Sequence, residues 1–161
     1  MPPLATSKDG THRRAEATLQ FVPEILIAAD AAHVYDELRS VVEGPDTTVR
    51  WIRQGEAVRE EMNRQPADLA IVDMQIGTMG GIAVCLDLRL ESDAGRLEPR
   101  PVLLVLDRRP DVFLARRSGA EGWIIKPLDP IRLRKAVTTL LAGGTWHDAS
   151  FTPEPVAVPF N

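Results

Sequence analysis

The chain has 161 residues, of which 44% are hydrophobic and 26% charged, and its formal net charge is −4. These values are typical of one globular domain with modest tails, and the charge gives no general attraction to nucleic acid or anionic membranes. No apolar run approaches the ~20 residues that span a bilayer, and the N-terminus has no apolar signal core. Because Cys85 is the only cysteine, an internal disulfide or thiolate metal cluster is excluded. We therefore expect a cytoplasmic protein.

Five short apolar segments alternate with five segments whose apolar residues recur at helical spacing. Strands are expected over 24–30, 47–52, 67–73, 101–106 and 122–125. Helices are expected over 32–42, 55–64, 82–94, 110–118 and 130–141. This alternation predicts a doubly wound α/β domain with a parallel sheet. We place the domain at 23–143, between a flexible N-terminal arm (1–22) and an extended, proline-containing C-terminal tail (144–161).

The segment 67–73 is the one around which the other elements are arranged. Leu69, Ile71 and Val72 form a short apolar run that ends on Asp73. Such a run is typical of a strand that is buried on both faces in the middle of a parallel sheet. Ligands and chemistry gather at the carboxyl ends of strands in open α/β sheets. Asp73 is therefore the first candidate for a functional side chain.

Ionic residues end three of the predicted strands: Asp30 the first, Asp73 the third and Lys126 the fifth. If the strand order is 2-1-3-4-5, the first and third strands are neighbours and flank the topological switch point. Two adjacent carboxylates repel each other, so we expect a cation between them, and an all-oxygen site with waters suits Mg²⁺. Lys126 can neutralise a phosphoryl group as a point charge. An aspartate held in this way is a plausible nucleophile toward phosphorus.

Two blocks of sequence surround these residues. One is SGAEGWIIKPL at 118–128, and the other is PADLAIVDM at 66–74, followed by Met-Gly-Gly at 79–81. With them, the chain from about 24 to 142 resembles the receiver domain of two-component response regulators. The resemblance implies a flavodoxin-like (CheY-like) (βα)5 fold with strand order 2-1-3-4-5. It also implies Asp73 as phospho-acceptor, Lys126 as the phosphate-pairing lysine, and Mg²⁺ held by Asp30, Asp73 and the backbone carbonyl of Gln75.

Several positions depart from the family pattern. Ala29 stands where the family has a second acid, so we expect Mg²⁺ to bind weakly, and Gly77 stands at a usual proline. Leu106 replaces the Thr or Ser that links the phosphoryl group to the switch aromatic, here Trp123. With Leu106 and Trp123 as its switch residues, phosphorylation should change the conformation of the output surface only weakly. Because an inward Asp107 would repel a phosphoryl group, we expect Asp107 to cap the next helix or face water.

These features predict a stand-alone response regulator receiver in bacterial two-component phosphorelay signalling, and not an enzyme. A sensor histidine kinase or phosphotransfer protein would supply the phosphoryl group. Output would be a protein contact, since no DNA-binding domain follows residue 142, with dimerisation expected through the last two helices and fifth strand. The alternative is a pseudo-receiver, a phosphorylation-independent protein-binding module. A flavodoxin-like enzyme or nucleotide binder is disfavoured, because the chain has neither G-x-G-x-x-G nor a P-loop.

Overall fold

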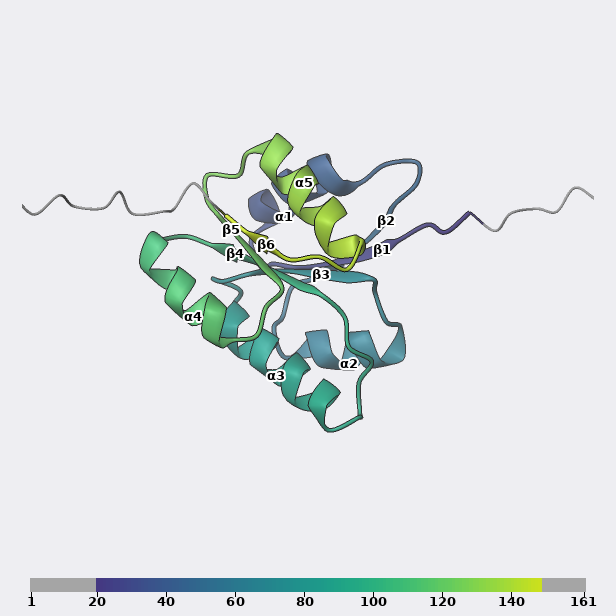
Figure 1. Ribbon diagram of the computed structural model, residues 1–161, viewed down its shortest axis with the longest axis vertical. Coiled ribbons are helices and arrows are strands. Elements are labelled where there is room, and N and C mark those ends of the chain that lie inside the picture. Colours follow the sequence, from purple (N-terminus) through teal and green to yellow (C-terminus); the bar gives the residue numbers. More distant parts are fainter. Residues whose placement is uncertain (1–19, 149–161) are drawn as a thin grey trace, which may run out of the picture.

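The computed structural model describes residues 20–148. A parallel six-stranded sheet in the order β2-β1-β3-β4-β5-β6 runs through its centre (Figure 1). The strands are β1 (Glu24–Ala28), β2 (Thr48–Ile52), β3 (Leu69–Asp73), β4 (Val102–Leu106), β5 (Gly122–Ile125) and β6 (Trp146–His147). The predicted α/β class and the order of the first five strands are confirmed.

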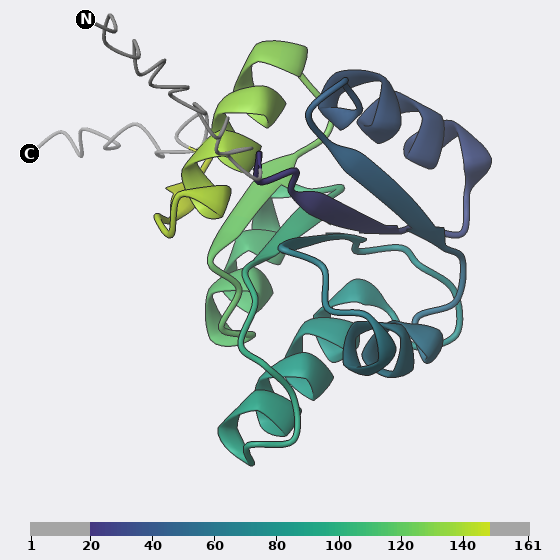
Figure 2. The same ribbon diagram turned by 90° about the vertical axis from the view of Figure 1, so that its right-hand side faces the viewer.

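Helices cover both faces of this sheet (Figures 1 and 2). One face carries α1 (Ala32–Val42) and α5 (Pro130–Leu141). The other face carries α2 (Ala57–Arg64), α3 (Gly81–Asp93), the 3-10 turn η1 (Arg109–Asp111) and α4 (Val112–Arg117). No helix within residues 20–148 is both long and apolar enough to cross a membrane.

Strand β3 shows how the sequence builds two cores on the two faces of one sheet. Ala70 and Val72 pack with the α2–α4 side, whereas Leu69 and Ile71 pack with the α1–α5 side. This is the two-residue period of a strand, and every residue of β3 is buried. The acid at the end of β3 is therefore held by a strand with cover on both faces, as the sequence predicted.

Helix α5 has a start signal that can be read from the sequence. Asp129 accepts a hydrogen bond from the backbone N–H of Arg132 at 2.8 Å, and Pro130 occupies the first turn. Both features satisfy or remove amide groups that have no partner inside the helix. The buried residues Leu133, Ala136, Val137 and Leu140 then recur at helical spacing and face the sheet.

The sixth strand corrects the predicted extent of the domain. Residues 144–161 were assigned to an extended tail, but Trp146 and His147 pair in parallel with Gly122 and Trp123 of β5. Only two residues form this strand, which is too short for an apolar period to be detected. Residues 149–161 of the predicted tail, and 1–19 of the predicted arm, lie outside the described residues.

Asp148 anchors this added strand. Its carboxylate, 1% exposed, forms an ion pair with Arg132 of α5 at 2.9 Å. It also accepts a hydrogen bond from the backbone N–H of Ile125 at 3.2 Å. Next to it, the ring of His147 stacks on Trp123 with centroids 4.0 Å apart. Removing this carboxylate takes an acceptor away from both the Arg132 guanidinium and the Ile125 N–H. Such a loss lowers the free energy of unfolding.

We therefore expect Asp148→Ala to lower the free energy of unfolding by about 1–3 kcal/mol, as measured by urea denaturation. The control is Asp46→Ala, because Asp46 is exposed in the connection before β2, and its effect should stay within about 0.5 kcal/mol. Equal stabilities of the two variants would show that Asp148 does not hold β6 in place.

Candidate functional site

The structure brings the predicted ionic residues to one end of the sheet. Asp73 is the last residue of β3, Lys126 directly follows β5, and Asp30 lies two residues beyond β1. Because all the strands are parallel, their carboxyl ends meet along one edge of the sheet. The Lys126 ammonium donates a hydrogen bond to Oδ1 of Asp73 at 2.9 Å. Asp73 and Lys126, which are far apart in sequence, are thus in direct contact.

Asp73 is almost completely buried, with 1% of its surface exposed. A buried carboxylate needs a partner to stay ionised, and Lys126 supplies it. Burial lowers the pKa of Lys126, but its hydrogen bonds to Asp107 and Asp73, with the charges of both acids, raise that pKa above the usual lysine value. The ammonium is therefore a permanent positive charge beside Asp73 at neutral pH.

Asp107 is placed differently from the prediction. It does not cap the following turn, since η1 has no side-chain cap. Its Oδ1 instead accepts a hydrogen bond from the Lys126 ammonium at 2.9 Å. An ammonium group has three donors, so Lys126 can hold both carboxylates at once, and a charge-assisted bond is stronger than a neutral one. The sequence showed an acid here, but not the direction in which it points.

Asp30, which follows β1, lies close to Gly77 in the loop after β3. A Cβ atom at Gly77 would lie 3.0 Å from Oδ2 of Asp30, so the missing side chain leaves room for this carboxylate. Arg53, which follows β2, donates to the backbone carbonyl of Asp30 at 3.3 Å. No sequence motif indicated this contact. Gln75 lies exposed in the loop directly after Asp73.

The oxygen donors at this end fit Mg²⁺ by their chemistry. Asp30 and Asp73 provide carboxylates and the loop after Asp73 provides carbonyl groups, which suits a hard cation that keeps several waters. No group of three or more His, Cys, Asp or Glu side chains within residues 20–148 is arranged to hold a metal ion. Ala29, at the position of the missing acid, is completely buried in the core on the α1–α5 side.

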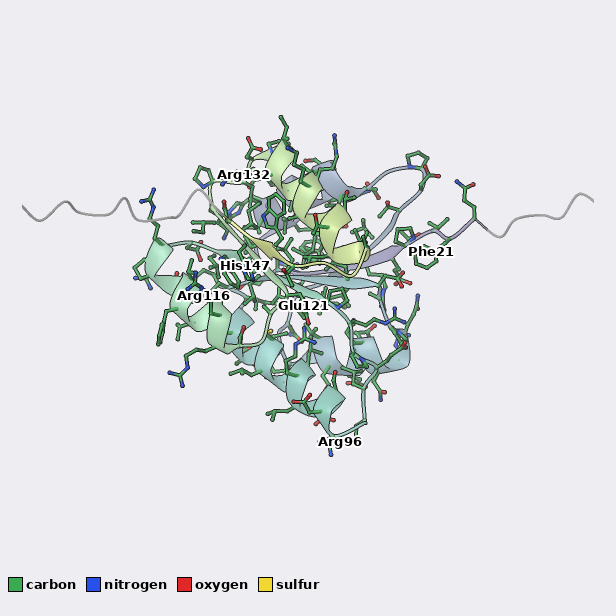
Figure 3. The ribbon with its side chains drawn as sticks, viewed as in Figure 1. Phe21, Arg96, Arg116, Glu121, Arg132 and His147 are labelled. Atoms are coloured by element: carbon green, nitrogen blue, oxygen red, sulfur yellow. The ribbon has the colours of Figure 1, made fainter. Side chains whose placement is uncertain are left out.

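The two predicted switch residues are both part of the core on the α2–α4 side. Leu106 is fully buried there and Trp123 is 3% exposed. Besides the stacked His147, the guanidinium of Arg116 lies 5.8 Å from the centre of the Trp123 ring. His147 belongs to β6 and Arg116 to α4, and both are labelled in Figure 3. Trp123 is therefore held by neighbours from both of these elements.

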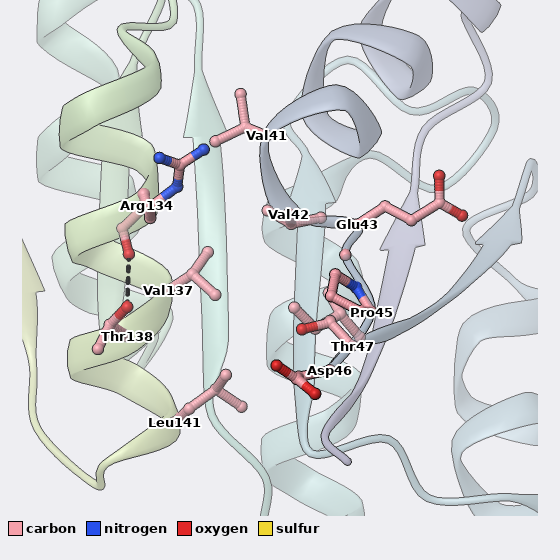
Figure 4. A pocket seen from close by; sticks show the side chains of 12 residues that line it. Val41, Val42, Glu43, Pro45, Asp46, Thr47, Arg134, Val137, Thr138 and Leu141 are labelled. Carbon is pink, nitrogen blue, oxygen red and sulfur yellow. Dashed lines mark hydrogen bonds between the residues drawn. The ribbon is translucent and has the colours of Figure 1, made fainter.

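A hollow elsewhere in the molecule is separate from this site. A pocket of about 310 Å³ lies between α5 and the segment from Val41 to Thr47. Figure 4 shows its lining side chains, among them Arg134, Val137 and Leu141 of α5. Ile25, near the start of β1, also lines it. It therefore lies at the amino end of the strands, opposite Asp73.

Comparisons with known proteins agree with this geometry. The family model of the response regulator receiver domain matches residues 25–138. An uncharacterized response regulatory protein of Mycobacterium tuberculosis is 38% identical over 98 residues, which cover 60% of this chain and 70% of that protein. The DNA-binding response regulator MtrA of M. tuberculosis is 30% identical over 109 residues, or 68% of this chain and 46% of MtrA.

A solved structure shows the same fold. The signal receiver domain of a signal transduction histidine kinase from Syntrophus aciditrophicus is 27% identical, with a TM-score of 0.67 over 86% of this chain and 99% of that one. The chain therefore belongs to the response regulator receiver domain family of two-component signalling, as its motifs predicted. It spans about half the length of MtrA, whose DNA binding is a property of that protein.

Gly81 determines how closely α3 approaches the end of β3. A Cβ atom there would lie 2.6 Å from the carbonyl oxygen of Asp73 and 2.8 Å from the Cα of Met74. Both are backbone atoms, so neither can rotate away as a side chain would. A larger residue at Gly81 must move α3 or the end of β3.

We expect Gly81→Ala to lower the free energy of unfolding by about 1–3 kcal/mol through overpacking, as measured by urea denaturation. Gly44→Ala is the matched control, because a Cβ there meets nothing within 4 Å, and its effect should stay within about 0.5 kcal/mol. A neutral result for Gly81→Ala would mean that α3 is free to move away from Asp73.

Proposed function

We propose that this receiver domain accepts a phosphoryl group on Asp73 from a sensor histidine kinase or a phosphotransfer protein. The observation that carries the proposal is the 2.9 Å contact between Asp73 and the Lys126 ammonium at the carboxyl end of the central strand. A carboxylate oxygen of Asp73 would attack the phosphorus, and the donor's bond to phosphorus would break. Lys126 would then offset the negative charge that the acyl phosphate brings.

Mg²⁺ is the cofactor that this function requires. Asp30, Asp73 and the backbone carbonyl of Gln75 would hold it, and Mg²⁺ would supply charge neutralisation at the transferred group. Asp30 is partly exposed, so it can exchange water for a cation. Ala29 leaves the site one carboxylate short of the family pattern, which supports weak binding.

Output is proposed to occur by protein contact in the cytoplasm, without catalytic turnover. Basic side chains are exposed on the last two helices: Arg116 and Arg117 on α4, and Arg134 and Lys135 on α5. Phe113 and Ile131, 64% and 66% exposed, add apolar surface. Since β6 pairs with the start of β5, a downstream partner or second copy would meet α4, α5 and β6 rather than a free fifth strand.

The direct test is intact-mass measurement after incubation with Mg²⁺ and acetyl phosphate. The wild-type protein and Asp46→Asn should each gain one phosphoryl group, whereas Asp73→Asn should gain none, because it lacks the nucleophile. An adduct that persists in Asp73→Asn would place the acceptor elsewhere.

A second candidate function is that of a pseudo-receiver, which binds a partner without phosphorylation. The buried Leu106 favours it, because its side chain offers no hydroxyl to link a phosphoryl group to Trp123. In this case neither the wild-type protein nor Asp73→Asn would gain mass with acetyl phosphate. Both would give the same amide NMR spectrum with and without Mg²⁺ and beryllofluoride, an analogue of the phosphoryl group.

A further inference from the structure

The fourth strand is followed by an acid, Asp107, one residue after Leu106, which stands where the family has a hydroxyl. Asp107 follows directly after β4 and is 27% exposed. Its Oδ1 lies 2.9 Å from the Lys126 ammonium, the same distance as Oδ1 of Asp73. Lys126 is thus shared between a carboxylate on the acceptor strand and a carboxylate on its neighbour.

The other oxygen of Asp107 is in an unfavourable position. Oδ2 is buried and has no hydrogen-bond partner among the described residues. A carboxylate oxygen left in this state costs free energy, so the bond to Lys126 must hold the side chain inward against that cost. Because more than a quarter of its side chain is exposed, Asp107 can turn toward water when another anion binds Lys126.

A phosphoryl group on Asp73 would be such an anion. It would add negative charge close to Asp107 and would need the same ammonium. Like charges at short distance repel by an amount that depends on how well water screens them, and Asp107 is only partly screened. Asp107 therefore competes with the phosphoryl group for the positive charge of Lys126.

We propose that the Asp107 carboxylate competes with the incoming phosphoryl group for Lys126. By binding the lysine before transfer, Asp107 slows phosphoryl uptake by Asp73. Asp107 is a positioning residue in this role, because it acts through Lys126. The inference rests on the proposed function and assigns regulation to the same site. If Asp107 instead bound Mg²⁺, loss of its carboxylate would weaken metal binding and would slow phosphoryl uptake.

The test compares the wild-type protein with Asp107→Asn, which keeps the size of the side chain and removes its charge. Asp46→Asn is the matched control, because it makes the same change in net charge at an exposed position near the opposite end of the sheet. Two quantities are measured with Mg²⁺ present: the rate of adduct formation with acetyl phosphate, and the affinity for beryllofluoride from amide NMR titration.

We expect Asp107→Asn to increase both the rate and the affinity by about fivefold or more, the effect of removing one nearby unit charge, while Asp46→Asn matches the wild type. Equal values for Asp107→Asn and the wild type would overturn the inference and leave the proposed function intact. A decrease in Asp107→Asn would also overturn it and would make Asp107 a ligand of Mg²⁺. No adduct and no beryllofluoride binding in any variant would overturn the proposed function together with the inference.

Discussion

The charge of one lysine side chain holds the carboxyl edge of this sheet together. Lys126 contacts Asp73 on β3 and Asp107 after β4, both at 2.9 Å, and its own backbone N–H bonds to Leu106 at 2.8 Å. Three neighbouring strand ends therefore meet at a single cation. The nearly complete burial of Asp73 depends on this arrangement, since a carboxylate in such a place must be paired to remain charged.

Much of this architecture follows from local sequence patterns. The alternation of strands and helices and the position of Asp73 at the end of a strand could be predicted, because the apolar period of each short segment shows them. The strand order was implied by the resemblance to receiver domains. The direction of Asp107 could not be predicted, because it depends on where Lys126, 19 residues away, comes to lie. Strand β6 was missed for a related reason: its two residues have no period, and Asp148 anchors them through tertiary contacts.

The site contains residues suited to the proposed phosphoryl chemistry and residues that would control its output. Asp73 and Lys126 are in direct contact, which the proposed acyl phosphate chemistry would use. Leu106 and Trp123, by contrast, are both buried in the apolar core on one face of the sheet, and Trp123 is covered by His147. The proposed chemistry and the route by which it would reach the surface thus depend on different residues, although Lys126 and Trp123 both belong to the β5 segment.

The short sixth strand also decides what the sheet presents at its end. An edge strand exposes unpaired N–H and C=O groups, and a long apolar edge is a template for aggregation. Here β6, with two residues, stands beside β5, whose four residues are all buried. Within residues 20–148, this side of the sheet therefore ends in a strand too short to offer a long edge for backbone pairing with another chain, and cutting the protein before Trp146 would expose the apolar edge of β5. A domain shortened there would also lose Asp148 and its ion pair with Arg132, so both its solubility and its stability would fall.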